Sequence, residues 1–331
     1  MNDPANRPVF SVVVPTHNRA RELAGMLEAL SAQSYPRNRF EVVLVDDGSD
    51  SPLAPVVGPF RDRLRITLLC QPQAGPANAR QRGVDRARGA YLAFTDDDCR
   101  PAPDWLARLE PCCLSHPGAA VGGRMINGLR ENPYSEASQL VVTYLTDYFN
   151  ADPNNATYFP TSNLVFPARP FRAAVGLDRR WSISGGEDRD LCRRWLAAGY
   201  RLIYCPEAVV YHYHRLDLRS FWRQHFSYGR GGFRHRYVAA AGSWRGLKFE
   251  RPTFYLRLVQ AAFLRLGPGM ACRVAPLVVL SQIANTAGFA REATMTLVSR
   301  WRAEQALGPG PHPVSCPAGG PTQAPDGTLV E

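Results

Sequence analysis

In YLAFTDDD, residues 91–98, a short apolar run ends directly in three aspartates, and this pattern indicates the fold class. An apolar run that does not alternate with polar residues is typical of a strand buried on both faces of a sheet. Two earlier stretches have the same form. Residues 9–14 are mostly apolar and end at Pro15, and residues 40–45 end in the turn Asp46-Asp47-Gly48-Ser49. We therefore predict three buried strands, each followed by polar residues.

Helical segments separate these strands. Residues 19–32 repeat apolar side chains every three or four positions, and residues 76–87 begin with a proline, which is favoured in a first helical turn. A further strand is predicted over residues 64–70. Strands that alternate with helices indicate the α/β fold class, with a Rossmann-like, mostly parallel sheet and helices on both faces.

Polar clusters follow three of the predicted strands: residues 16–19, Asp46-Asp47 and residues 96–98. In parallel sheets ligands bind beyond the carboxyl ends of the strands, so these clusters are expected to meet at one edge. Turn-forming residues would explain any one cluster. They do not comfortably explain three consecutive carboxylates after a buried strand, so we predict a ligand site at this edge.

The three aspartates can bind one divalent cation, because Asp96 and Asp98 flank Asp97. Mg²⁺ and Mn²⁺ prefer oxygen ligands, usually one or two carboxylates together with substrate phosphates. Adjacent aspartates without a metal or a basic partner would raise one another's pKa. We therefore predict a Mn²⁺ or Mg²⁺ site, where the ion stabilises the charge that develops on a departing diphosphate.

A second acidic pair, Glu187-Asp188, follows Gly185-Gly186 at the start of a predicted helix that runs to Ala198. Acidic residues favour the first turn of a helix through the macrodipole, which is one interpretation of the pair. The other is a general base that takes a proton from an attacking hydroxyl. Spacing alone does not choose between them.

Weaker patterns cover the rest of the chain. Between residues 105 and 156 we expect one helix, a short strand near Ala119 and a mixed aromatic segment. Strands are predicted over residues 157–166 and 201–205. The tail from about Gly308 is rich in proline and glycine and is predicted to be disordered.

The net charge raises a different class of function. The 331 residues include 39 Lys plus Arg and 29 Asp plus Glu, a formal net charge of +10. Residues 211–257 hold ten basic and two acidic residues, so this segment alone carries +8. A nucleic-acid-binding α/β protein would need such a segment as an exposed stripe, but the acidic clusters argue against nucleic acid as a partner. The 45% share of hydrophobic residues excludes a wholly disordered chain.

Two features bear on location. The eight cysteines lack the spacing of a metal site, and the polar N-terminus lacks a signal-peptide pattern, so we expect reduced thiols and a cytoplasmic protein. The longest uncharged run near the C-terminus, residues 274–290, has 17 residues, fewer than the roughly 20 that span a bilayer. Two interpretations stay open: an amphipathic segment on an anionic membrane surface, and a helical cap on the core or on a second copy.

Five motifs resemble those of family 2 glycosyltransferases with the GT-A fold, over roughly residues 9–235. In order they are VVVPTHNR (12–19), VDDGS (45–49), GPANAR (75–80), FTDDD (94–98) and GED (186–188). The resemblance implies an inverting enzyme that transfers a sugar from a nucleotide-diphosphate sugar to an acceptor hydroxyl. It also implies a divalent cation, Mn²⁺ or Mg²⁺.

The resemblance assigns the nucleotide sugar to residues of the first four motifs. These residues are Pro15, Thr16, His17, Arg19, Asp46, Asp47, Asn78, Arg80, Asp96 and Asp97. His17 and Asp47 would contact the base, and Arg80 would lie near the diphosphate. Asp188 would be the general base, and Glu187 would position it or the acceptor.

The resemblance assigns the metal to Asp96 and Asp98, although three aspartates in a row leave Asp97 as an alternative to Asp98. His212 and His214 follow the last predicted strand, where related enzymes often place a metal- or phosphate-contacting histidine. They are either ligands or ordinary strand histidines. Both interpretations stay open.

Residues 224–228, QHFSY, depart from the Gln-x-x-Arg-Trp motif of processive synthases, which favours transfer of a single sugar. We expect a lipid-linked or cell-envelope glycan as acceptor, and a protein that is cytoplasmic or peripheral on the inner face of the membrane. The expected domains are 1–235 (nucleotide half 9–100, acceptor half 101–235), a basic and apolar helical extension 236–305, and a tail 306–331. A non-catalytic homologue that binds nucleotide sugars is the remaining alternative.

Overall fold

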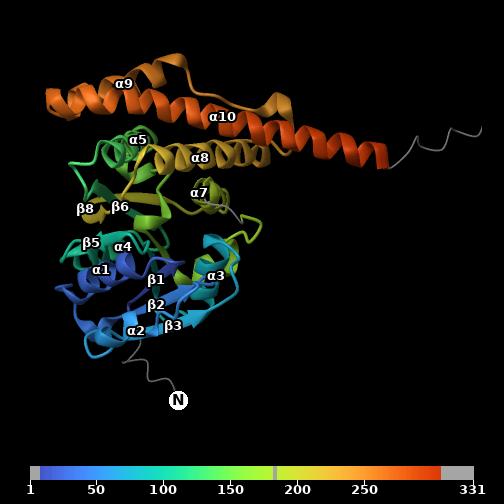
Figure 1. The fold of residues 1–331 in the computed structure, drawn as a ribbon. Helices are drawn as coiled ribbons and strands as arrows, with labels where there is room; N and C mark the ends of the chain where they lie inside the picture. The colour runs from blue at the N-terminus through green and yellow to red at the C-terminus, as the bar shows by residue number, and fades with distance from the viewer. Residues whose placement is uncertain (1–7, 182–184, 307–331) are drawn as a thin grey trace, which may run out of the picture. The chain divides into compact units, whose positions relative to one another are not determined.

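A computed structural model describes residues 8–181 and 185–306 (Figure 1). By its internal contacts the chain divides after Glu292 into two units, and the described part of the second unit is helical. The predicted disordered tail lies outside the described residues. The predicted division into a 1–235 domain, an extension and a tail stays a prediction.

The first unit is built on one eight-stranded sheet with the order β3-β2-β1-β4-β7-β6-β8-β5. Its strands are β1 Phe10–Thr16, β2 Phe40–Asp46, β3 Ile66–Cys70, β4 Tyr91–Phe94, β5 Cys99–Pro101, β6 Ala120–Asn127, β7 Leu164–Pro167 and β8 Leu202–His212. The helices of the described chain are α1 Ala20–Ser31, α2 Ala54–Val57, α3 Pro76–Arg86, α4 Trp105–Ser115, α5 Pro133–Phe149, α6 Ala168–Pro170, α7 Glu187–Ala197, α8 Leu218–Ala239, α9 Pro252–Arg265 and α10 Pro268–Ala306.

The sheet is mixed. Strands β1 to β4 pair in parallel, as does β6 with β8, whereas β7 is antiparallel to both β4 and β6 and β5 is antiparallel to β8. The expected mostly parallel sheet therefore holds for the N-terminal half. The order β3-β2-β1-β4 places the polar ends of β1, β2 and β4 at one edge, where ligands of such sheets bind.

Alternate residues of each strand pack on opposite faces of this sheet. In β1, Val12 and Val14 contact a core with α1, α2 and α4, whereas Val13 faces a second core with α3 and α7. All three valines are fully buried. Burial on both faces explains why β1 lacks the polar alternation of a surface strand.

Three sequence expectations need correction. The mixed aromatic segment is the helix α5, which Asn132 caps by accepting hydrogen bonds from the backbone amides of Tyr134 and Ser135. The strand expected over residues 157–166 shrinks to β7, because residues 161–163 form a 3₁₀ turn. The strand expected over residues 201–205 instead continues to His212, and this extension carries its end into the site.

A third layer of helices covers the sheet edge. Apolar side chains of α5, α8, α9 and the first half of α10 form a separate core, which includes Val141, Phe221, Leu258 and Val278. In Figure 1, α9 and α10 lie over α5 and α8. Helices α8 and α10 approach closely, since a Cβ on Gly229 would lie 1.9 Å from the carbonyl oxygen of Asn285. This helical layer covers the sheet edge where the polar ends of β1, β2 and β4 meet.

Candidate active site

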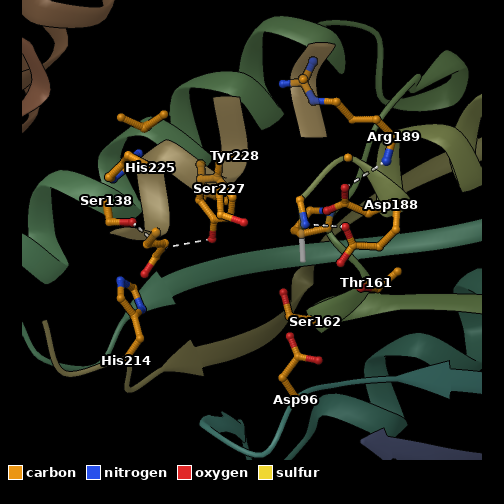
Figure 2. Close-up of a pocket in the computed structure, with 18 of the residues that line it drawn as sticks. Asp96, Ser138, Thr161, Ser162, Asp188, Arg189, His214, His225, Ser227 and Tyr228 are labelled. Atoms are coloured by element: carbon orange, nitrogen blue, oxygen red, sulfur yellow. Dashed lines mark hydrogen bonds between the residues drawn. The ribbon is translucent and has the colours of Figure 1, made fainter. Parts of the chain in front are cut away.

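One large cavity of about 1450 Å³ runs from the ends of β1, β2 and β4 to the helical layer. It contains most of the residues predicted for the site: Pro15, Thr16, His17, Arg19, Asp47, Arg80, Asp96, Asp97, Asp98, Glu187, Asp188, His212 and His214. Residues from six separate sequence regions thus meet at one place. Figure 2 shows Asp96 and Asp188 at one side of this pocket and His214 and His225 at the other.

Asp47 organises the loop at the end of the cavity that β1, β2 and β4 form, the end predicted to bind the nucleotide. Its Oδ1 accepts hydrogen bonds from Gln71 Nε2 (2.7 Å) and the amide of Ala74 (2.9 Å), and its Oδ2 accepts one from the amide of Gly75 (2.8 Å). Gly75 has φ of 91°, a conformation that favours glycine. His17 reaches the same loop, with its Nε2 3.2 Å from Gln73 Nε2. Asp47 therefore holds the loop in which α3 begins.

Two predicted residues do not line the cavity. Asp46 accepts a hydrogen bond from the amide of Ser49 (2.9 Å), so its carboxylate holds the turn after β2. Asn78 donates hydrogen bonds to the carbonyl oxygens of Ala74 (2.8 Å) and Arg179 (3.1 Å). Both residues support the loops of the nucleotide end, and sequence reasoning did not anticipate that role for Asp46.

Arg19 balances the charge of the aspartate cluster. Its Nη1 lies 3.1 Å from Asp97 Oδ1 and 2.8 Å from Asp98 Oδ2. Burial raises the pKa of Asp97 to about 7, against the opposing effect of Arg19. Burial also disfavours the ionised form of Asp98, but charge and hydrogen bonding from His212, with Arg19, hold its pKa below the usual range. The two neighbouring carboxylates therefore differ in protonation behaviour.

The donor atoms beside Asp98 suit a divalent cation. His212 Nε2 lies 3.3 Å from Asp98 Oδ1, and Asp98, Cys99 and His212 each place a possible ligand atom within 4.8 Å of the others. Burial raises the pKa of the Cys99 thiol well above its usual value, which makes it a poor ligand for a hard cation. His214 packs against His212 with ring centroids 3.9 Å apart and the rings tilted by 45°. Within the described part of the chain, its ring nitrogens have no hydrogen-bond partner.

Arg80 links the aspartate cluster to the second acidic pair. It is buried, and its Nη2 lies 2.5 Å from Asp96 Oδ1. Burial opposes its charge, but Asp96, Glu187 and Asp188 all raise its pKa above the ordinary value. Among residues 8–181 and 185–306, nothing is hydrogen-bonded to its Nε or Nη1. A buried guanidinium with free donors offers a binding position for an anionic ligand.

Two glycines shape the turn that carries Glu187 and Asp188. Gly185 and Gly186 have φ of 115° and 91°, and a Cβ on Gly186 would lie 2.6 Å from the carbonyl oxygen of Gly231 in α8. Glu187 is buried and accepts a hydrogen bond from the amide of Gly185 (2.6 Å). Burial, followed by the charge of Asp188, raises its pKa to about 7.

Asp188 points into the cavity from the first turn of α7. Its Oδ1 accepts a hydrogen bond from the amide of Arg189 (2.9 Å; Figure 2). Its Oδ2 accepts one from the hydroxyl of Tyr158 (3.3 Å). Burial raises the pKa of Asp188, although Arg189 and these hydrogen bonds oppose the rise. A buried carboxylate with a raised pKa is a stronger base than one in water.

Sequence reasoning missed four polar residues that line the cavity. We call them the far wall: Tyr158, Gln224, His225 and Tyr228. Tyr158 precedes β7, and Gln224, His225 and Tyr228 lie on α8, where Gln224 Nε2 donates to Tyr228 Oη (2.9 Å). Gln224 also donates to the hydroxyl of Ser138 on α5 (3.0 Å). In the sequence, residues 224–228 indicate only a departure from the Gln-x-x-Arg-Trp motif.

Comparison with known proteins places this geometry in a family. The family model described as "Glycosyl transferase family 2" matches residues 11–175. The amylovoran biosynthesis glycosyltransferase AmsB of Erwinia amylovora is 41% identical over 233 residues, which cover 65% of this chain and 72% of AmsB. Glycosyltransferase AglE of Haloferax volcanii is 29% identical over 227 residues, 68% of this chain and 73% of AglE.

The pre-mycofactocin glycosyltransferase of Mycobacterium tuberculosis is 31% identical over 233 residues, 68% of this chain. The match spans only 47% of that longer protein.

Solved structures share the fold. The mannosyltransferase PcManGT from Pyrobaculum calidifontis, in complex with GDP-Man and Mn²⁺, superposes with a TM-score of 0.56 at 22% identity. The match covers 92% of this chain and 85% of PcManGT. Residues 1–349 of Staphylococcus aureus TarS with UDP-GlcNAc give a TM-score of 0.51 at 17% identity, over 87% and 91% of the two chains. This chain belongs to glycosyl transferase family 2, and it is a glycosyltransferase with the GT-A fold.

Proposed function

We propose that this glycosyltransferase moves a single sugar from a nucleotide-diphosphate sugar to an acceptor hydroxyl, with inversion at the anomeric carbon. The observation that carries the proposal is the shared cavity, in which the aspartate cluster and Asp188 lie around the buried cation of Arg80. A diphosphate needs cationic partners, and an attacking hydroxyl needs a base. The cavity contains both the cationic Arg80 and the carboxylate of Asp188.

The nucleotide end would bind the donor through Pro15, Thr16 and His17, beside the loop that Asp47 holds. Asp96, Asp98 and His212 would hold Mn²⁺ or Mg²⁺, which neutralises charge on the departing diphosphate when it is bound. The donor set of carboxylate and imidazole atoms fits such a cation. PcManGT, which shares the fold, binds GDP-Man and Mn²⁺. The free donors of Arg80 would contact the diphosphate oxygens.

Asp188 would act as the general base. Its carboxylate takes the proton of the acceptor hydroxyl while the oxygen forms a bond to the anomeric carbon. The bond from that carbon to the diphosphate oxygen breaks on the opposite side, so the products are the inverted glycoside and a nucleoside diphosphate. Tyr158 would keep Asp188 oriented through its hydrogen bond, and the helical layer would limit the access of water.

For the acceptor we propose a glycan of the cell envelope or a lipid-linked glycan, and for the location the inner face of the membrane. The relative AmsB is a biosynthetic glycosyltransferase for amylovoran, which supports a glycan as product. The basic segment 211–257 is partly neutralised inside the fold, since Arg230 and Arg234 each pair with Glu292 (2.8 and 2.5 Å). Such internal pairing argues against a nucleic-acid stripe.

A donor panel tests this proposal. Purified protein with Mn²⁺ or Mg²⁺ is given UDP-, GDP- and dTDP-sugars with a membrane extract, and the release of nucleoside diphosphate is measured. We expect release from one donor class. The Asp188→Asn variant should lose transfer while donor binding stays nearly intact, and Asp62→Asn, the same change at an exposed position, should be fully active. Full activity of Asp188→Asn would refute the base assignment.

A further inference from the structure

Helix α9 and the adjoining part of α10 carry an unusual charge pattern. Residues 251–291 contain five arginines and no aspartate or glutamate. Arg265 pairs with Asp147 on α5 (2.8 Å), and Arg291 lies 3.8 Å from Glu292. Within residues 8–181 and 185–292, no carboxylate lies within ion-pair distance of the exposed residues Arg251, Arg257 and Arg273. This segment therefore presents unbalanced positive charge.

The same two helices expose large apolar side chains. On α9, Leu256 is 63% exposed, Phe263 58% and Leu264 83%, and on α10, Val279 is 45% and Ile283 54% exposed. We call these five residues, with Arg251, Arg257 and Arg273, the α9–α10 face. A cluster of large apolar side chains with a cationic border marks an interaction site in a folded protein.

The opposite sides of these helices are held by the protein. Leu258 of α9 and Val274 and Val278 of α10 are buried in the core shared with α5 and α8. A Cβ on Gly288 would lie 2.0 Å from the carbonyl oxygen of Phe226 in α8, so α10 cannot leave α8 without losing close backbone packing. Over residues 268–300, α10 has the length and composition of a membrane span, and one 18-residue stretch of it has a mean hydropathy of 1.2. Its packed inner side instead suits a helix that lies along a surface.

A groove beside this face shares lining residues with the active-site cavity. A second cavity of about 450 Å³ is lined by Glu250, Pro252, Tyr255, Leu256, Val259, Val279 and Gln282. Glu250, Tyr255 and Gln282 also line the large cavity that contains Asp188. Near these residues the large cavity is walled by apolar side chains: Val141, Val142, Leu145, Phe254, Leu258 and Phe289.

We propose that the α9–α10 face docks on an anionic bilayer, with its apolar residues in the interface and its arginines against lipid phosphates. The cavity mouth at Tyr255 and Gln282 then faces the bilayer, and the acceptor is a membrane-anchored molecule whose apolar chain lies in the groove. The docking rests on the face alone. The assignment of the acceptor rests on the proposed transfer function as well.

Vesicle binding tests the docking without any transfer reaction. The full-length protein is sedimented with vesicles of phosphatidylglycerol and phosphatidylcholine (1:1) and with vesicles of phosphatidylcholine alone. We expect at least tenfold tighter binding to the anionic vesicles, and we expect it to weaken as salt rises. Leu256→Glu and Phe263→Glu should each weaken binding at least tenfold. Leu114→Glu is the matched control, because Leu114 on α4 is 62% exposed.

Absence of binding to the anionic vesicles, or equal binding by Leu256→Glu, overturns the docking. Light scattering distinguishes membrane docking from self-association. If the protein is a dimer that Leu256→Glu dissociates, and it does not bind vesicles, the α9–α10 face binds a second copy of the chain. Circular dichroism of each variant confirms that it is folded.

A fluorescence measurement tests the orientation of the mouth. Phe263→Trp and Tyr255→Trp should each add an emission component that brominated lipid in anionic vesicles quenches, whereas Leu114→Trp should not. Quenching at Phe263→Trp without quenching at Tyr255→Trp overturns the acceptor route but leaves the docking. If vesicles bind as expected and no donor is turned over, the transfer function fails and the docking stands.

Discussion

Arg80 Nη2 lies 2.5 Å from Asp96 Oδ1, and this buried guanidinium is the cationic partner that the aspartate cluster shares with Glu187 and Asp188. The three carboxylates come from two distant parts of the chain. Their charges would repel one another without Arg80. The aspartate cluster and the Glu187–Asp188 pair are therefore electrostatically coupled through one side chain.

Replacing Arg80 by methionine should destabilise the protein. Loss of one partner leaves buried carboxylates unbalanced, which costs about 3 kcal/mol of unfolding free energy in typical buried pairs. Arg80→Lys should lose less, because it keeps the charge. Urea unfolding measures both, with Arg82→Met, an exposed change on the same helix, as the control. Equal unfolding midpoints for Arg80→Met and wild type would contradict the role of Arg80.

Gly231 should be intolerant of a side chain. A Cβ there would lie 1.7 Å from the carbonyl oxygen of Gly185, so α8 must move away from the turn that carries Glu187 and Asp188. We expect Gly231→Ala to lower the unfolding free energy by about 2 kcal/mol and to reduce kcat. At Gly232 the nearest atom is the flexible end of Arg236 at 3.2 Å. Gly232→Ala should therefore be neutral or stabilising, and identical effects of the two changes would refute the packing argument.

The hydrogen bond from Tyr158 should set the acid limb of the pH–rate profile. This bond lowers the pKa of Asp188, so Tyr158→Phe raises it. Because the base must be ionised, the rate then begins to rise only at higher pH. We expect the acid limb to move to higher pH, because the ionised carboxylate loses one hydrogen bond. Tyr200→Phe, whose ring stacks on Trp195 away from the cavity, should leave the profile unchanged.

His212 should contribute more to the affinity for the divalent cation than His214. His212 Nε2 lies 3.3 Å from Asp98 Oδ1, whereas the ring nitrogens of His214 have no hydrogen-bond partner among the residues that the structure describes. We expect His212→Ala to raise the half-saturating Mn²⁺ concentration at least tenfold, measured by calorimetry with a nucleoside diphosphate present. His214→Ala should change it less. The reverse order would move the ligand assignment to His214.

Glu187 should make the protein less stable as pH rises. Its pKa rises from an ordinary 4.5 to about 7 in the folded state. Between these values the folded state binds more protons than the unfolded one, so the stabilisation present below pH 4.5 is lost by pH 7. The loss amounts to at most about 3 kcal/mol. Urea unfolding from pH 5 to pH 8 should show a smaller decline for Glu187→Gln than for wild type, with Glu131→Gln, an exposed change, as the control. Equal declines for Glu187→Gln and wild type would exclude this role.

Much of the nucleotide end could be predicted because its signals are local. The strands β1, β2 and β4 are buried on both faces, so they show as apolar runs, and their ends show as polar clusters. Parallel pairing then forces those ends to one edge. The helix that begins at Glu187 was equally visible, because two glycines and an acidic first turn mark its start.

The far wall of the cavity could not be predicted in this way. Tyr158, Gln224 and His225 carry no pattern that separates a polar cavity residue from a surface one, and α5 was hidden in an aromatic segment. Their roles depend on contacts between helices far apart in the sequence, such as Gln224 with Ser138.

By itself the sequence determined the α/β sheet, the position of the acidic clusters and the family, because these depend on short periodic patterns and fixed motifs. Only the tertiary structure decided which charges meet. It placed Arg80 between Asp96 and Asp188, gave Asp46 a supporting role, and exposed the apolar side chains of the α9–α10 face. The physical reason is that charge balance and burial belong to a neighbourhood in space, which residues far apart in the chain create together.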